Sequence, residues 1–162
     1  MRQELTTDTV DRYIEAPPET LYDIVSDVTR TPEMSPEIEK CTWIKGATGP
    51  VVGARFRAIN RAGRGHWPNW PVVIAADPGR EFAFARTEPF GGTVEWRYRF
   101  VPEGSGTRVH ESYEVTKPIG LVGWFIISTL GGLKDRRADL RAGMTQTLDR
   151  LADISEAKPQ QS

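Results

Sequence analysis

The pattern of apolar and polar positions near the C-terminus predicts one long amphipathic helix. Large apolar side chains recur at spacings of 7, 4, 4 and 3, at Leu133, Leu140, Met144, Leu148 and Leu151. At 3.6 residues per turn these spacings put all five on one face. Charged residues from Lys134 onward occupy the other face. We therefore expect a helix over about residues 133–155 that covers the rest of the fold.

Two residues depart from this helical pattern. Arg137 falls about 40° from Leu133 and about 20° from Met144 on a helical wheel, so it lies within the apolar stripe. Gly143 lies on the flank of the stripe, where it costs roughly 1 kcal/mol relative to alanine. A close approach by the sheet or by a ligand would explain the glycine. The alternative is that Arg137 reaches solvent at the rim of the stripe and Gly143 is merely tolerated.

Before this helix the sequence predicts mostly strands. Seven strand-like segments are separated by Gly- and Pro-rich turns: 9–15, 38–45, 54–61, 70–76, 81–87, 93–101 and 107–116. Short loops require antiparallel neighbours. Apolar residues spaced as i, i+3, i+4 and i+7 predict a short helix over 21–28, and a weaker signal suggests a second over 32–35. The prediction is an α+β fold, with a seven-stranded antiparallel sheet covered on one face by the terminal helix.

Alternation within the strands indicates which side chains face the helix. The inward sets are Val94, Trp96, Tyr98 and Phe100; Val109, Glu111, Tyr113 and Val115; Phe56, Ala58 and Asn60; and Phe82 with Phe84. The inner face is thus large and aromatic, with few polar groups. Such a surface is typical of a small-molecule cavity, and the alternative is an ordinary packed core.

Glu111 is the most unusual member of the inward set. A buried carboxylate is costly unless it is hydrogen-bonded, paired or protonated. Because the helical wheel also sends Arg137 inward, we expect the two side chains to approach within salt-bridge distance near one end of the cavity.

Composition limits the class of protein. A chain of 162 residues with a net charge of −1 is expected to form a single domain, ordered over about 8–155 with polar tails. No lysine- or arginine-rich run argues for nucleic acid. The N-terminus has no apolar signal segment, and a single Cys41 fits a reducing cytoplasm. The uncharged run 118–133 is too short to span a bilayer, so we expect it to cap the cavity, without stable membrane insertion. Homodimerisation is left open.

Motif searches exclude several chemistries. The glycines at 46, 49 and 53 lie between two strands, so they do not form a nucleotide or phosphate loop. His66, His110 and Cys41 are isolated from one another, which predicts neither a metal site nor any other cofactor. Trp67 and Trp70 are three residues apart, so a regular strand aims them at opposite faces; the sequence does not say which one faces the cavity.

Several stretches carry a family resemblance over roughly residues 8–155. They are 10–27, 52–57 with Asn60-Arg61, Trp67, 76–84, 94–100 leading to 106–109, and Gly143-Met144 with Thr147-Leu148. With these motifs the chain resembles the polyketide cyclase/dehydrase-like branch of the START/Bet v 1-like (SRPBCC) superfamily. The resemblance implies the helix-grip fold, a curved sheet around the C-terminal helix with a cavity for a lipid-like, polyketide or aromatic molecule. Some members are cyclases or aromatases and others bind or carry ligands, and no catalytic constellation matches residue by residue.

Three functions follow. The first is binding of a small hydrophobic molecule, with contacts expected from Phe56, Asn60, Phe84, Trp96, Tyr98, Glu111, Tyr113, Arg137 and Met144. The second is a cyclase, aromatase or dehydrase in which Glu111 moves a proton and Arg137 or a tyrosine hydroxyl steadies an enolate. The third is lipid exchange at a membrane surface through residues 121–130. The sequence does not decide whether the protein is an enzyme.

Overall fold

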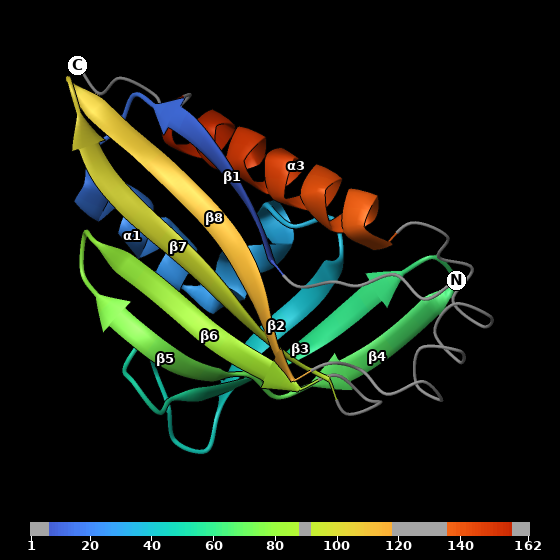
Figure 1. Ribbon diagram of the computed structural model, residues 1–162. Helices are drawn as coiled ribbons and strands as arrows, with labels where there is room; N and C mark the ends of the chain where they lie inside the picture. Colours follow the sequence, from blue (N-terminus) through green and yellow to red (C-terminus); the bar gives the residue numbers. More distant parts are fainter. Residues whose placement is uncertain (1–6, 88–91, 118–135, 157–162) are drawn as a thin grey trace.

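The structure, a computed structural model, describes residues 7–87, 92–117 and 136–156 (Figure 1). Its strands are β1 (Thr7–Ile14), β2 (Ile38–Ile44), β3 (Arg55–Ala62), β4 (Gly65–Asn69), β5 (Val72–Asp77), β6 (Glu81–Thr87), β7 (Thr93–Glu103) and β8 (Gly106–Lys117). Helix α1 (Pro18–Ser26) and the 3-10 helix η1 (Val28–Glu33) follow β1, and α3 (Arg136–Glu156) comes last. The predicted α+β helix-grip architecture is confirmed.

The strands form one antiparallel sheet in the order β1-β8-β7-β6-β5-β3-β2, and β4 pairs with β3 beside this path. Tyr98 on β7 lies opposite Glu111 on β8, and Phe84 on β6 lies opposite Trp96 on β7. The sheet curls, and α3 lies across the end where β1 and β8 pair (Figure 1). The register therefore puts the predicted inward residues of β6, β7 and β8 on one concave face.

The seven predicted strands are all present, and a short additional strand pairs beside them. The sequence predicts seven strands, with 62–65 as a turn before the strand at 70–76, and the structure has an eighth, β4. Both β4 and β5 pair with β3, since Trp67 lies opposite Asn60 and Val72 lies opposite Arg55. Regular strand structure is interrupted at residues 70–71, where Pro71 has no N–H to donate to a ladder. The sequence of β4 has the pattern of a loop because the strand is short and contains Gly65 and Pro68.

The two short helices begin where their sequences favour it. Pro18 occupies the first turn of α1. A backbone N–H at this position has no acceptor within the helix, so proline, which lacks this N–H, fits here without loss of a hydrogen bond. The Asp27 side chain accepts a 3.2 Å hydrogen bond from the Thr29 N–H and so caps η1. This cap starts the second helix at Val28, which is four residues before the predicted start at Pro32.

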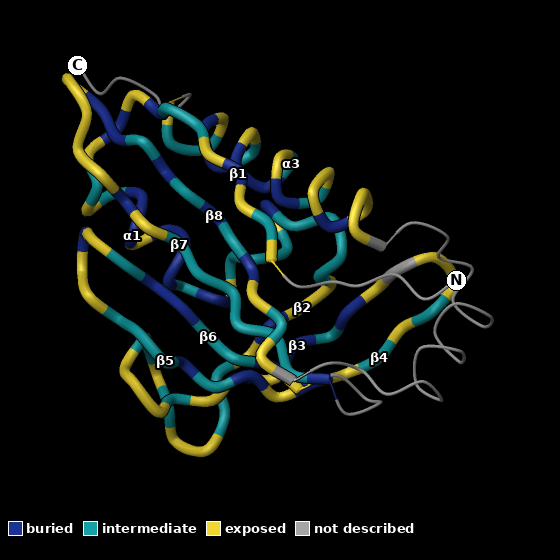
Figure 2. Tube along the Cα trace, in the orientation of Figure 1, coloured by how far each residue is buried: buried dark blue, intermediate teal, exposed yellow. Residues whose placement is uncertain are grey.

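Helix α3 packs against β1, β8 and α1. Its described apolar stripe, Leu140, Met144, Leu148 and Leu151, is buried as predicted, while Leu133 lies outside the described residues. Arg141 Nη1 lies 2.7 Å from Asp8 Oδ1, and Arg12 Nη1 lies 3.5 Å from Asp149 Oδ1; both pairs join α3 to β1. Figure 2 shows the exposed residues of α3 on the side away from the sheet.

Candidate functional site

A cavity lies between the concave face of the sheet, α3 and the segment from α1 to β2. Its volume is about 70 Å³, and a buried water needs roughly 10–15 Å³ of such space. The apolar walls come from Val25, Val28, Met34, Ile38, Phe56, Ala58, Pro71, Phe82, Phe84, Trp96, Leu140 and Met144. The cavity thus has room for several water molecules or a small organic molecule within a mainly apolar wall.

The aromatic part of this wall is built by rings from β3, β6, β7 and β8 that pack against one another. The rings of Phe56 and Phe84 meet edge to face with centroids 5.4 Å apart. Trp96 packs against Tyr113 at the same centroid distance. Such contacts between rings fix their orientation and contribute about 0.5–1.5 kcal/mol each beyond the area they bury. The wall is therefore a preformed apolar surface.

Glu111 and Tyr98 form the first polar group of the cavity. The Tyr98 hydroxyl donates a 3.0 Å hydrogen bond to Glu111 Oε2, and both residues line the cavity. Burial raises the pKa of Glu111 to about 8, although the hydrogen bond from Tyr98 opposes this rise. Burial, with Glu111 close by, also holds the pKa of Tyr98 well above its usual value. At neutral pH Glu111 is therefore mostly protonated, and Tyr98 keeps its proton.

Glu111 Oε1 and Trp96 Nε1 on this wall are fully buried and have no hydrogen-bond partner among the described residues. Trp96 lies opposite Tyr113 and Glu111 lies opposite Tyr98, so the two residues are diagonal neighbours on β7 and β8. Diagonal cross-strand neighbours are about 7–8 Å apart, within reach of long side chains. Buried polar groups normally have partners, so this pair is where the cavity can recognise a polar atom.

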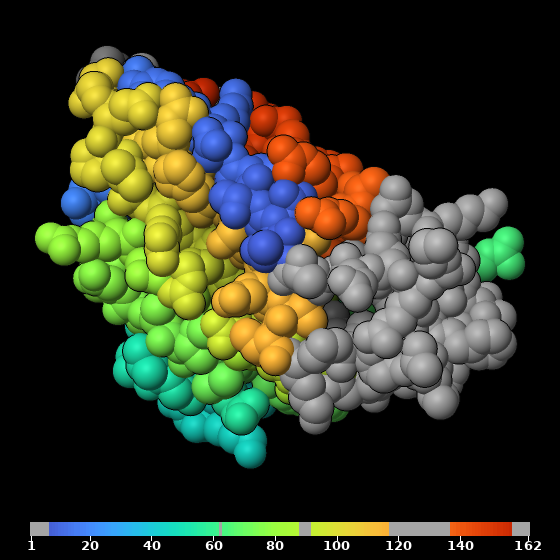
Figure 3. Space-filling model, viewed as in Figure 1, coloured from blue at the N-terminus to red at the C-terminus, as the bar shows by residue number. Residues whose placement is uncertain are grey.

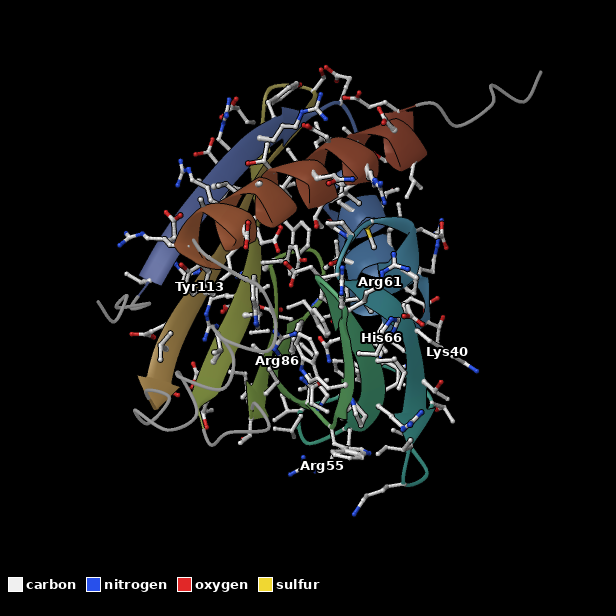
Figure 4. The ribbon with its side chains drawn as sticks, turned by 90° about the vertical axis from the view of Figure 1, so that its right-hand side faces the viewer. Lys40, Arg55, Arg61, His66, Arg86 and Tyr113 are labelled. Atoms are coloured by element: carbon white, nitrogen blue, oxygen red, sulfur yellow. The ribbon has the colours of Figure 1, made fainter. Side chains whose placement is uncertain are left out.

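Arg86 is a cavity residue that the sequence reasoning missed. The residue is 7% exposed, and its Nη1 donates a 2.9 Å hydrogen bond to Asn60 Oδ1 (Figure 4). Its guanidinium carbon lies 5.5 Å from the centroid of the Trp96 ring, a cation–π distance. The signal was present in the sequence, because residues 82, 84 and 86 alternate and so share a face.

Cys41 also lines the cavity. Burial raises the pKa of its thiol to about 12, while a hydrogen bond with Thr31 and the nearby charge of Arg86 lower it less strongly. Only the thiolate is an effective nucleophile. The structure therefore favours an inert core thiol at this position.

Six of the nine predicted contact residues line the cavity: Phe56, Phe84, Trp96, Tyr98, Glu111 and Met144. Asn60 is buried behind the wall, where it accepts the Arg86 hydrogen bond and donates to the Trp67 carbonyl. Tyr113 is buried against Trp96. Trp96 and Tyr98, predicted to point inward, are half-buried and neither is exposed.

The predicted pairing of Glu111 with Arg137 is wrong. Arg137 is exposed in the first turn of α3, and Glu111 has its hydrogen bond from Tyr98 instead. No cation contributes to the raised pKa of Glu111. The helical wheel gave the correct face for the stripe, but the long side chain of an arginine near a helix end can extend its charged group to the protein surface. The hydrogen bond from Tyr98 takes the place of the predicted salt bridge.

The structure shows where Trp67 and Trp70 lie, whereas the predicted cap falls outside the described residues. Trp67 shares the inward face of Asn60, whereas Trp70 is 51% exposed, and neither lines this cavity. The predicted cap over residues 118–133 lies outside the part of the chain that the structure describes. Within the described part, no helix has both the length and the apolar character needed to cross a membrane.

Comparison with known proteins now identifies the family. Residues 6–156 match the model of the family described as polyketide cyclase/dehydrase and lipid transport. The chain belongs to this family. A polyketide-cyclase-like protein from Corynebacterium glutamicum is 34% identical, with 94% of this chain and 92% of that chain covered and a TM-score of 0.62. A search of curated proteins found no match.

Two more distant structures share the fold of this family member. The di-domain ARO/CYC protein StfQ of the steffimycin biosynthetic pathway is 12% identical with a TM-score of 0.73, over 94% of this chain and 51% of that chain. Ara h 8.0201 is 13% identical with a TM-score of 0.67, over 94% of this chain and 98% of that chain. These similarities are evidence for the helix-grip fold alone.

Proposed function

We propose that this protein binds a small, mainly apolar molecule in the cavity between the sheet and α3. The observation that carries the proposal is the combination of an aromatic and aliphatic wall with two buried polar atoms, Glu111 Oε1 and Trp96 Nε1, that have no partner among the described residues. A packed core would leave such atoms unsatisfied at a cost of about 1–3 kcal/mol each. A ligand or a bound water recovers that cost.

The chemistry of these two atoms limits the polar group of the ligand. An indole N–H only donates, and a protonated carboxyl can donate its O–H. With a pKa of about 8, Glu111 keeps its proton at neutral pH. The pair therefore favours a ligand with an uncharged acceptor oxygen, such as a carbonyl, on an apolar or aromatic body.

Gly143 provides a direct test of the proposed binding site. It lines the cavity, and apart from the glycine, its chain neighbours and the adjoining helix backbone, no heavy atom of the described residues lies within 4 Å of the position its Cβ would take. A leucine at this position is expected to fill the cavity. Ala142 is its exposed neighbour on the same helix, so Ala142→Leu adds a comparable apolar side chain outside the cavity and serves as the matched control.

Binding is measured with the uncharged fluorescent probe N-phenyl-1-naphthylamine, and native mass spectrometry of the purified protein searches for a copurified molecule. The expected result is saturable probe binding that Gly143→Leu lowers at least tenfold and Ala142→Leu leaves unchanged (~1.4 kcal/mol per tenfold). Equal affinities of the two variants, each folded by circular dichroism, would overturn the proposed site.

A second candidate function is a cyclase- or dehydrase-type reaction. One observation favours it: Glu111 lines the cavity with a pKa of about 8, close to the value that suits a general acid or base at neutral pH. Glu111 would transfer a proton to or from a β-keto substrate, and the Tyr98 hydroxyl would hold the carboxyl in place. Glu111→Gln is expected to abolish turnover of such a substrate and to keep probe binding. Unchanged turnover would exclude Glu111 as the acid or base.

A further inference from the structure

Positive charge is concentrated in one part of the chain. Residues 38–72 contain six of the 21 lysines and arginines but only one of the 22 acidic residues, Glu39. This stretch therefore carries a net charge of +5, and the rest of the chain carries −6. Because the cations alternate with apolar residues, they form no continuous basic run, and the sequence pattern alone gave no sign of a polyanion partner.

Strand pairing brings these cations to the outer face of β2, β3 and β4. Arg55, Arg57 and Arg61 alternate along β3 with the inward Phe56, Ala58 and Asn60, and all three arginines are exposed. Lys40 lies opposite Ile59, and Arg61 lies opposite His66. Lys40, Arg61 and His66 lie near one another on the outer side of these strands in Figure 4. We call Lys40, Arg55, Arg57 and Arg61, with the flanking Lys45 and Arg64, the basic face.

The charges of the basic face are not neutralised locally. Among the described residues, no carboxylate lies within ion-pair distance of Lys40, Arg55, Arg57 or Arg61. The single acidic residue in this stretch, Glu39, is next to His66, with its Oε2 2.5 Å from His66 Nδ1. By contrast, Arg97, Arg108 and Arg141 elsewhere on the surface each lie beside a carboxylate. The basic face therefore projects a positive potential into solvent.

Exposed apolar side chains accompany these charges. Of the four large apolar side chains exposed in the described part of the chain, three belong to this stretch: Val51 at 66%, Val52 at 64% and Trp70 at 51%. Val51 and Val52 lie in the loop between β2 and β3, which projects at the lower edge of the molecule (cyan in Figure 3). Arg55 Nη1 donates a 2.8 Å hydrogen bond to the Trp70 carbonyl, so charge and exposed indole belong to one surface.

We propose that the basic face and the adjoining Val51, Val52 and Trp70 form a docking surface for an anionic lipid bilayer. Lysine and arginine are attracted to the negative surface of such a membrane. Tryptophan is enriched at the membrane–water interface, and a pair of aliphatic side chains in a projecting loop can enter the headgroup region. An acidic protein or a nucleic acid would match the charges but gives no reason for the exposed valines. The docking is peripheral and does not depend on a ligand in the cavity.

The test is vesicle flotation with purified protein. Phosphatidylcholine vesicles are compared with phosphatidylcholine–phosphatidylglycerol vesicles at low and high salt. The charge variant is Arg57→Glu with Arg61→Glu. Its matched control is Arg80→Glu with Arg99→Glu, because both control arginines are exposed outside this stretch and lack an ion pair among the described residues. The apolar variant is Val51→Ser with Val52→Ser, and its control is Val101→Ser, the fourth exposed apolar residue.

The protein is expected to float with the anionic vesicles only, and binding should weaken as salt rises. Each cation near an anionic surface contributes about fivefold to partitioning, so the charge variant should bind at least ~30-fold more weakly, and its control should bind as wild type. The apolar variant should lose the binding that remains at high salt. Equal binding of variant and control, or no binding to either vesicle, would overturn the proposal. Binding of the protein to poly-glutamate or to duplex DNA without binding to vesicles would also overturn the proposal. That result would assign the basic face to an acidic protein or a nucleic acid.

Discussion

Tyr98 and Glu111 face each other across β7 and β8, and the phenol donates a 3.0 Å hydrogen bond to a carboxyl group that the cavity keeps mostly protonated at neutral pH. The pair is neutral, so it avoids the cost of placing a charge in an apolar interior. One oxygen of Glu111 bonds to Tyr98, and the other is left for the cavity.

Replacement of Glu111 by glutamine should change how stability depends on pH. Burial raises the Glu111 pKa from 4.5 to about 8, so the folded protein keeps a proton that the unfolded chain releases between these values. The wild-type free energy of unfolding should therefore fall relative to Glu111→Gln as pH rises from about 4.5 to 8, by at most ~1.4 kcal/mol per pH unit, and then level off. Urea denaturation of both proteins at several pH values across this range measures the difference in their free energies of unfolding.

The control for this pH dependence is Glu114→Gln, which changes an exposed carboxyl on the same strand. It should show the same pH profile as the wild-type protein. If wild type and Glu111→Gln run parallel from pH 4.5 to 8, Glu111 is ionised in the folded protein, and the neutral pair does not exist.

Removal of the Tyr98 hydroxyl should destabilise the protein and raise the Glu111 pKa further, because the hydrogen bond from Tyr98 lowers that pKa. Tyr98→Phe is expected to cost about 1–3 kcal/mol, the cost of a buried acceptor that loses its donor. Tyr13→Phe is the matched control, since its hydroxyl donates a 2.8 Å hydrogen bond to the exposed Glu15 and should contribute under ~0.5 kcal/mol. Denaturation of both variants at pH 6 gives the comparison; equal losses would contradict a buried role for the pair.

The fold was predictable from the sequence because its signals are local. Alternation along β7 and β8 gave the inward residues, and the helical spacing of Leu140, Met144 and Leu148 gave the buried face of α3. The missed strand, β4, is short and interrupted by proline, and only its pairing with β3 makes it a strand. The alternation of apolar and polar residues along a strand does not show which strands pair in the folded protein.

The candidate site was predictable only in part. The wall residues follow from alternation, and so does Glu111. The partner of Glu111 depends on the cross-strand register, which sets Tyr98 opposite it, and on the exposure of Arg137. The basic face has the same origin, because Lys40 and Arg57 are distant in sequence and meet only through the pairing of β2 and β3.

Cys41 should be unreactive in the folded protein. The residue is 6% exposed, and burial raises the pKa of its thiol to about 12, so almost no thiolate is present at pH 8. Reaction with 5,5′-dithiobis(2-nitrobenzoic acid) should be slow in buffer and fast in urea. An exposed thiol on α3, Ala142→Cys in a Cys41→Ser background, gives the reference rate. Comparable rates for native Cys41 and this reference would show that the cavity wall opens to solvent.

Two glycines should respond in opposite ways to alanine. Gly143 lies in α3, and no heavy atom of the described residues outside the adjoining helix backbone and its chain neighbours lies near the position of a new Cβ. Gly143→Ala should therefore stabilise the protein by up to about 1 kcal/mol through helix propensity. A Cβ at Gly106 would overlap the Ile14 carbonyl oxygen and lie 2.7 Å from the Tyr13 hydroxyl. Gly106→Ala should therefore cost roughly 1–3 kcal/mol or more.

Urea denaturation of the two alanine variants decides between an open and a filled cavity beside α3. If the cavity is open, the midpoint for Gly143→Ala should rise and that for Gly106→Ala should fall, with unchanged slopes. Gly143→Ala should also keep most of its affinity for N-phenyl-1-naphthylamine, since one methyl group removes little of the space that Gly143→Leu fills. Destabilisation by Gly143→Ala would mean that the space beside the helix is already occupied. The proposed binding site would then have no open space next to α3.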